Sequence, residues 1–179
     1  MKLLVVVDMQ KDFVTGVLGT EEARSIVDAV YDIAKEYDGE VVYTMDTHTA
    51  SYLETQEGRN LPVIHCVEGT EGFELMDCLK ELSEQKGSKV FKKPSFGSIA
   101  LGEYVKDLAE HHGLTQVELV GVCTDICVIS NAMVIKAFAP EVEVSVYENA
   151  TAGVTVESHN NALDAMKACQ IRIEKSRME

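Results

Sequence analysis

Basic residues are scarce in this sequence, which has 16 Lys and Arg against 30 Asp and Glu and a formal net charge of −14. Nucleic acids and anionic membrane surfaces need a basic surface on their partner, so the charge argues against both. No apolar run approaches the roughly 20 residues that a membrane-spanning helix needs. The sequence therefore predicts a protein that binds neither nucleic acid nor membrane.

Cysteines are too few and too irregularly spaced for a disulfide framework. Their number is odd, five in all: Cys66, Cys78, Cys123, Cys127 and Cys169. The opening segment 1–8 is too short for a secretion signal and runs directly into a carboxylate, so we expect a cytoplasmic protein with reduced thiols. Cys123 and Cys127 lack a second Cys or His pair of similar spacing, which argues against a structural zinc site there.

Strand and helix patterns alternate along the 179 residues, which suit one domain over 1–179. Runs rich in Val, Ile, Leu or Tyr predict strands at 2–8, 40–46, 88–92, 117–122, 142–147 and 170–174. Helical spacing of apolar residues predicts helices at 20–37, 71–85, 99–112, 126–139 and 157–169. This alternation predicts an α/β fold, a single-domain doubly wound sheet of about six mostly parallel strands with helices on both faces.

The segment 121–128 (GVCTDICV) carries the strongest candidate for catalysis. It follows a predicted strand and leads into a predicted helix, which places Cys127 in the first helical turn. Free N–H groups and the helix dipole there lower the pKa of a thiol and can hold an oxyanion. Because ligands bind at the carboxyl ends of strands in open α/β sheets, Cys127 is predicted to be a nucleophile for an acyl substrate.

Two further strand ends carry charged residues that could serve this nucleophile. Asp8 closes the first predicted strand; it is either a turn or capping residue, or a general base toward the thiol. Lys92 and Lys93 end the third predicted strand. A lysine pair is normally solvated, but one of the two should lie at the crevice and stabilise a thiolate and a carboxylate.

Possible metal ligands lie near both ends of the long connection at 47–70. Asp46 and His48 are two residues apart and could face one cavity, and His65 could complete a site of two imidazoles and one carboxylate. Such a set suits Zn²⁺ or Fe²⁺, although scattered histidines more often make ordinary hydrogen bonds. Long connections inside compact domains are usually functional or disordered, and the ligands at its ends favour function. His159 has no evident partner, so no role is assigned to it.

Taken together, these residues make the chain resemble the isochorismatase-like cysteine hydrolases, and among them the nicotinamidases. The resemblance covers nearly the full length, and its motifs are residues 5–13 (VVVDMQKDF) and the highly specific 121–128. It implies a catalytic triad of Asp8, Lys93 and Cys127. It also implies a cis peptide bond before Cys123 and an oxyanion hole made by the N–H groups of Cys123 and Cys127.

The resemblance also bears on the metal. Asp46-Thr47-His48 followed by residues 62–70 (PVIHCVEGT) matches a nicotinamidase pattern that isochorismatases and carbamoylsarcosine-type amidases generally lack. It implies a divalent metal on Asp46, His48 and His65, with Zn²⁺ expected and Fe²⁺ or Mn²⁺ as alternatives. Two features depart from the pattern: the chain lacks the usual Trp between that Asp and His, and Phe96-Gly97-Ser98 replaces the usual residues after the catalytic Lys. Because of the altered loop the choice of Lys93 over Lys92 is inferred, and the loop bears on the substrate more than on the chemistry.

The expected reaction is hydrolysis of nicotinamide to nicotinate and ammonia, a step of NAD metabolism, through a Cys127 thioester. Asp8 would be the general base and Lys93 its electrostatic partner. Phe13 and Phe96 would either sandwich the ring or belong to the core. The expected partners are a small-molecule amide and further copies of the chain in a homo-oligomer. The alternatives are a metal-independent hydrolase acting on another small molecule, a non-catalytic binding protein of the same fold, and a redox sensor.

Overall fold

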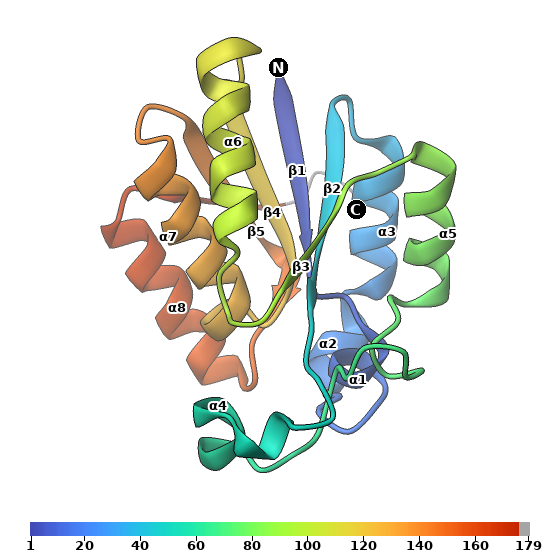
Figure 1. The fold of residues 1–179 in the computed structure, drawn as a ribbon. Helices are drawn as coiled ribbons and strands as arrows, with labels where there is room; N and C mark the ends of the chain where they lie inside the picture. Colours follow the sequence, from blue (N-terminus) through green and yellow to red (C-terminus); the bar gives the residue numbers. More distant parts are fainter. Residues whose placement is uncertain (176–179) are drawn as a thin grey trace.

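The computed structural model describes residues 1–175, which form one open sheet between two layers of helices (Figure 1). The strands are β1 (Lys2–Val7), β2 (Glu40–Asp46), β3 (Val90–Lys93), β4 (Gln116–Val122), β5 (Glu143–Ala152) and β6 (Arg172–Glu174). All neighbouring pairs are parallel, in the order β3-β2-β1-β4-β5-β6. The central strands are nearly continuous apolar runs because both of their faces are covered. The predicted α/β fold is confirmed.

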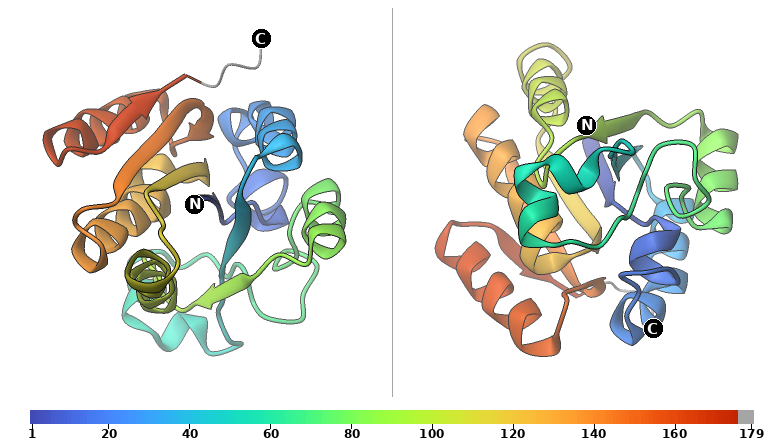
Figure 2. Two further views of the ribbon diagram at one scale, coloured as in Figure 1. Left: turned by 90° about the horizontal axis from the view of Figure 1, so that it is seen from above. Right: turned by 60° about the horizontal axis from the view of Figure 1, so that its bottom comes forward.

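The helices divide between the two faces of the sheet. They are α1 (Lys11–Val14), α2 (Glu21–Ser25), α3 (Val27–Glu36), α4 (Gln56–Asn60), α5 (Asp77–Lys86), α6 (Ile99–His111), α7 (Ile129–Phe138) and α8 (Val156–Ala168). Helices α3 and α5 cover one face, and α6, α7 and α8 cover the other (Figures 1 and 2). Side chains of β1 alternate accordingly, with Leu4 and Val6 in the first core and Leu3, Val5 and Val7 in the second. Within residues 1–175 the structure contains no helix with the length and apolar character of a membrane span.

Several predicted helices have different bounds in the structure. The predicted helix at 20–37 is wrong as a single element, since it is interrupted at Ile26 between α2 and α3. The predicted helix at 71–85 begins only at Asp77. Residues 72–76 instead hydrogen-bond to the segment after β1, for example from Lys11 N to Glu74 O at 2.8 Å. Tertiary contacts thus override the helical pattern there.

The predicted helix at 126–139 begins in a different way. A π-helical turn, η2 (Thr124–Val128), precedes α7, so Cys127 lies in this turn rather than in the first turn of an α-helix. The connection at 47–70 also has structure of its own, a 3₁₀ helix at Tyr52–Glu54 and α4. Helix α4 carries a side chain of the site described below.

The strand order reverses between β1 and β4, and the carboxyl ends of these two strands border a crevice. Doubly wound sheets bind ligands at such a reversal. Gly121 permits the close junction: its φ is +112°, and a Cβ there would lie 2.1 Å from the carbonyl oxygen of Val7. Asp8 and the η2 turn follow directly from these neighbouring strands, so the fold brings both to the crevice.

Candidate active site

Asp8, Lys93 and Cys127 come from the ends of β1 and β3 and from the η2 turn, and they meet at the crevice. Nζ of Lys93 lies 2.6 Å from Oδ2 of Asp8 and 3.5 Å from Sγ of Cys127. All three side chains are buried. Lys92, by contrast, has a half-exposed side chain that pairs with Glu68 at the surface. Lys93 is therefore the lysine at the crevice.

The electrostatics of this group differ from the expectation drawn from a helix N-terminus. Burial raises the pKa of the Cys127 thiol well above its usual value, and the charge of Asp8 adds to the rise while Lys93 opposes it. The expected lowering of this pKa is therefore wrong. Burial likewise raises the pKa of Asp8, against the opposing charge of Lys93. Both pKa values are thus raised, and the ammonium group of Lys93 lies beside the two groups between which a proton would pass.

Lys93 supplies a permanent positive charge beside that pair. Burial alone would lower the pKa of its ammonium group, but the charges of Asp8, Cys127 and Asp46 raise the pKa overall. The Asp8 carboxylate is held from its other side by Thr44, whose hydroxyl donates to Oδ1 at 2.7 Å. The backbone of Asp8 has a φ of +47°, a left-handed conformation that Asp and Asn tolerate better than most residues.

The backbone of the η2 turn is tightly defined. The peptide bond between Val122 and Cys123 is cis, as the resemblance implied. The carbonyl oxygen of Cys123 accepts hydrogen bonds from the N–H groups of Ile126 and Val128, at 3.1 and 3.0 Å. The side-chain amide of Asn131 donates to the carbonyl oxygen of Cys127 at 2.8 Å. These bonds fix the turn that carries the thiol.

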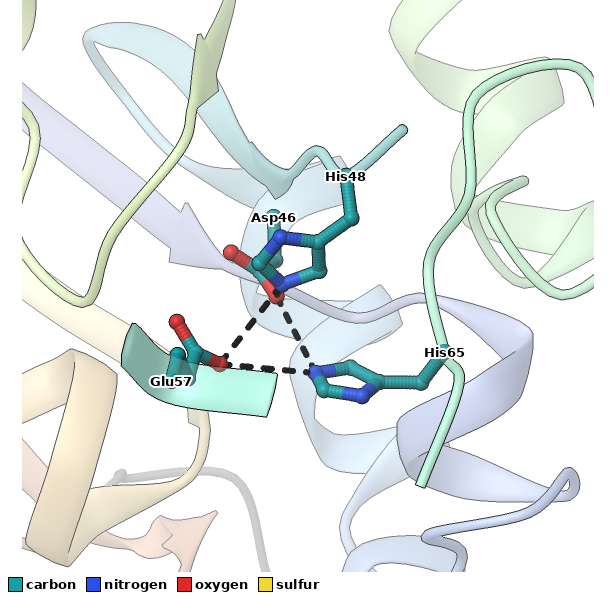
Figure 3. Close-up of side chains that lie close together, drawn as sticks. All are labelled: Asp46, His48, Glu57 and His65. Atoms are coloured by element: carbon teal, nitrogen blue, oxygen red, sulfur yellow. Dashed lines mark ion pairs between the residues drawn. The ribbon is translucent and has the colours of Figure 1, made fainter. Parts of the chain in front are cut away.

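A second cluster contains the three predicted metal ligands and one more carboxylate. Asp46, His48, Glu57 and His65 each present one ligand atom, and these atoms lie within 4.8 Å of one another (Figure 3). Nε2 of His48 lies 2.8 Å from Oδ2 of Asp46, and Nε2 of His65 lies 3.5 Å from it. Oε1 of Glu57 is 3.6 and 3.8 Å from the same two nitrogens.

The donor set fits a divalent metal ion. Two imidazoles and two carboxylates suit Zn²⁺, Fe²⁺ or Mn²⁺. Despite its short distance to Asp46, Nε2 of His48 is buried and makes no hydrogen bond within the described part of the chain, as expected for a nitrogen that ligates a metal. Nδ1 of His65 lies 2.7 Å from the carbonyl oxygen of Val63, which orients the ring with Nε2 toward the cluster. Gln10 anchors Asp46 by bonding to both its backbone N–H and its carbonyl oxygen, at 2.7 and 2.9 Å.

Glu57 is the member of this cluster that was not predicted from the sequence. It lies on α4, a single short helix inside the connection at 47–70. Thr55 caps that helix by accepting a hydrogen bond from the N–H of Gly58 at 3.0 Å. A Thr before a short polar segment was the available signal for the helix. The distance in sequence between Glu57 and the other three residues did not indicate that Glu57 would join them.

Both clusters border one cavity of about 230 Å³. Asp46, Glu57 and His65 line it on the metal side and Cys123 and Cys127 on the thiol side. Its remaining wall is mainly apolar and is made by Phe13, Leu18, Thr20, Leu61, Phe96, Ile126 and Val154. The two clusters also touch directly, because Nζ of Lys93 is 3.6 Å from Oδ1 of Asp46.

Both predicted aromatic residues reach this cavity. The ring of Phe13 packs against His65, with 5.5 Å between ring centroids and a tilt of 59°. Phe96 lines the cavity from another segment and remains 44% exposed. The two rings therefore border the space where a small molecule would bind.

Solved structures with the same fold include hydrolases of known type. A crystal structure of a nicotinamidase/pyrazinamidase from Bacillus subtilis superimposes with a TM-score of 0.84 at 28% identity, covering 97% of this chain and 99% of that one. A Pyrococcus horikoshii pyrazinamidase in complex with zinc gives a TM-score of 0.77 at 27% identity, covering 98% of this chain and 99% of that one.

Sequence comparisons agree with the structural ones. A nicotinamidase from Schizosaccharomyces pombe is 28% identical over 203 residues, covering 95% of this chain and 91% of that protein. The model of the isochorismatase domain matches residues 2–176, which is nearly the whole chain. The chain therefore belongs to the isochorismatase family.

Proposed function

We propose that this hydrolase of small amides converts nicotinamide to nicotinate and ammonia through a thioester on Cys127. The observation that carries the proposal is the position of Lys93, whose ammonium group lies 2.6 Å from Asp8 and 3.5 Å from Cys127. The thiol of this group lines a cavity whose wall also contains three residues of the metal-ligand set. The similarity to a nicotinamidase and to a nicotinamidase/pyrazinamidase supports the choice of amide.

In the first half of the reaction Asp8 takes the proton of Cys127, and the sulfur attacks the amide carbonyl carbon. The N–H groups of Cys123 and Cys127 hold the oxyanion of the tetrahedral intermediate, which stabilises the transition state for acyl transfer. The intermediate collapses, the C–N bond breaks, and Asp8 gives its proton to the leaving ammonia. Lys93 remains charged and balances the negative charge that moves between Asp8 and the sulfur.

In the second half Asp8 takes a proton from water, and the resulting hydroxide attacks the thioester carbonyl. The same N–H groups hold the second oxyanion. The C–S bond then breaks, the proton returns from Asp8 to Cys127, and nicotinic acid leaves and loses the second proton of the water to solvent as nicotinate. The raised pKa of the buried Asp8 suits a group that must carry a proton in both halves.

Asp46, His48, Glu57 and His65 are the residues that would hold a divalent metal ion, with zinc expected. When bound, the ion supplies a Lewis acid at the cavity wall that can hold the pyridine nitrogen and orient the ring. Phe13 and Phe96 are proposed to contact the ring faces. The rival function, a metal-independent hydrolase of another small molecule, leaves this four-residue cluster without a role.

The Lys93→Ala protein should lose most of its activity and unfold at a lower temperature. Removing one partner of a buried ion pair typically destabilises a protein by ~3–5 kcal/mol, because the other charge is left unpaired. Lys92→Ala is the matched control, and it should change stability by less than about 0.5 kcal/mol and leave turnover intact. Thermal unfolding and nicotinamide kinetics on both proteins check this. A harmless Lys93→Ala beside a damaging Lys92→Ala would contradict the assignment.

His65→Ala should lose the metal and raise KM for nicotinamide on the order of 10-fold or more, because the ring is no longer oriented. Alkylation of Cys127 by iodoacetamide should continue, since the Asp8, Lys93 and Cys127 group remains. In the wild type, metal binding should weaken as pH falls, because the imidazoles must be neutral to ligate. Metal analysis, kinetics and peptide mass spectrometry measure these effects, with the exposed His111→Ala as control. Metal-free wild-type protein with full activity would support the rival function.

A further inference from the structure

His159 lies on α8 and contacts the turn that carries the proposed oxyanion hole. Its Nδ1 is 2.8 Å from Oγ1 of Thr124, a side chain with no exposed surface. Thr124 directly follows Cys123, whose N–H is one of the two proposed oxyanion donors. His159 itself lines a separate cavity of about 250 Å³, which shares no lining residue with the cavity at Cys127. The mechanism proposed above assigns His159 no role.

The segment 153–159, which contains His159, contacts the η2 turn at a second point. Oδ1 of Asp125 accepts a hydrogen bond from the backbone N–H of Val154 at 3.1 Å. Gly153 makes the close packing possible, because a Cβ there would lie 2.9 Å from the Cβ of His159. Residues 153–159 therefore hold two consecutive residues of the η2 turn, and one of the two bonds is a part-buried contact between side chains.

The chemistry of His159 suits a fixed neutral partner. Burial lowers the pKa of its imidazole, although the nearby charges of Glu148 and Asp125 oppose that effect. A neutral imidazole has one donor and one acceptor nitrogen, so Nδ1 can pair with the hydroxyl of Thr124 without adding a charge beside the oxyanion hole. The contact can therefore set the geometry of the turn without altering the charge balance of Asp8 and Lys93.

We propose that His159 is a positioning residue that, through Thr124, holds the Cys123 N–H where the oxyanion of acyl transfer develops. The inference rests on the proposed Cys127 mechanism. An oxyanion hole works only when its donors are already aimed at the developing charge, so a small displacement of the turn is costly. His159 touches neither the substrate nor the sulfur. Its effect is confined to the steps in which a carbonyl oxygen becomes negative.

Two probes of Cys127 separate this role from a merely structural one. With pyridine-3-carbaldehyde, a C–S bond forms, the carbonyl π pair moves to oxygen, and the thiol proton passes to Asp8, so the adduct carries an oxyanion. With iodoacetamide, sulfur displaces iodide at a saturated carbon and no oxyanion forms. A displaced N–H weakens aldehyde binding but leaves alkylation unchanged. A collapsed site impairs both.

The experiment compares His159→Leu, His159→Asn and Thr124→Val with the wild-type protein. In His159→Leu, kcat for nicotinamide should fall and the aldehyde dissociation constant should rise by a similar factor, on the order of 10-fold. KM and the rate of Cys127 alkylation, followed by peptide mass spectrometry, should not change. His159→Asn should restore most of the loss, because its amide can occupy the position of Nδ1. The exposed His111→Leu is the matched control and should behave as wild type.

The partner residue supplies an independent arm. Thr124→Val should reproduce the His159→Leu defect, and the double variant should be no worse than either single one, because both remove the same contact. Wild-type aldehyde affinity in His159→Leu or Thr124→Val would overturn the proposal, as would losses that add in the double variant. Should His159→Leu fail to fold, Thr124→Val and His159→Asn still decide the matter. Failure of the proposed function gives a different result, a Cys127→Ala protein that still hydrolyses nicotinamide.

Discussion

Cys127→Ala should abolish nicotinamide hydrolysis and leave the fold intact. Among the five cysteines, all of them within residues 1–175, Cys127 alone combines a position in the turn after β4 with contact to the Lys93 ammonium group, 3.5 Å away. Without the sulfur no thioester can form, and loss of a covalent nucleophile typically lowers kcat by a factor on the order of 10⁶. The change removes one buried atom and no charge, so the protein should remain folded. Steady-state kinetics and thermal unfolding measure the two effects.

The other thiols provide the controls for this result. Cys169 is exposed, and Cys169→Ala should keep the activity of the wild type. Cys66 is buried and Cys78 is partly buried, and Cys66→Ala and Cys78→Ala should each keep at least part of the activity. A fully active Cys127→Ala protein would refute the covalent mechanism. Loss of activity in Cys169→Ala would show that the assay depends on a thiol outside the site.

Asp8→Asn should lower kcat by about 10²–10⁴-fold, the usual contribution of general acid–base catalysis. An amide cannot take the proton of Cys127 or pass it to the leaving ammonia. Asn is the appropriate replacement because it is nearly isosteric and tolerates the left-handed backbone at this position, where φ is +47°. The variant leaves Lys93 without its closest carboxylate, so we expect a lower unfolding temperature. The kcat of the variant should therefore be measured at a temperature at which the variant is still folded.

A second carboxylate-to-amide change controls for this loss of stability. Asp38 lies in the turn before β2, away from the crevice, and Asp38→Asn should leave kcat and the unfolding temperature unchanged.

Rapid kinetics on Asp8→Asn should show slower formation and slower hydrolysis of the thioester, since Asp8 acts in both halves of the reaction. An Asp8→Asn protein with the kcat of the wild type would remove Asp8 from the mechanism and leave Cys127 without a base.

The sheet was predictable from the sequence because its strands are marked by their own residues. Segment Leu3–Val7 is apolar on both faces, and Val117–Val122 is apolar apart from Glu118, which indicates buried parallel strands. The helix bounds were less predictable. Residues 72–76 have a helical pattern but bond to the segment after β1, a contact between regions far apart in the chain that no local pattern reveals.

The residues of the site also differ in how far they could be predicted from the sequence. Asp8, Cys127 and the lysine pair stand at strand ends or in a short motif, so their place at the crevice could be predicted from position. The choice of Lys93 and the metal role of the histidines were implied by the resemblance to a family. Glu57 and His159 could not be predicted, since each reaches the site from an element whose placement depends on the whole fold. The pKa of Cys127 was predicted in the wrong direction for a related reason. A helix N-terminus is visible in sequence, whereas burial beside Asp8 is not.

The central claim is that nicotinamide and Cys127 form a nicotinoyl thioester, and product partitioning tests it most directly. The wild-type protein is given nicotinamide or methyl nicotinate in the presence of hydroxylamine, and nicotinohydroxamate and nicotinate are quantified. The amide and the ester form the same thioester, which no longer contains the leaving group, so both substrates should give the same ratio of hydroxamate to nicotinate. The Cys127→Ala protein should give neither product. Ratios that differ between the amide and the ester would mean that water attacks the bound substrate directly, and would contradict the account.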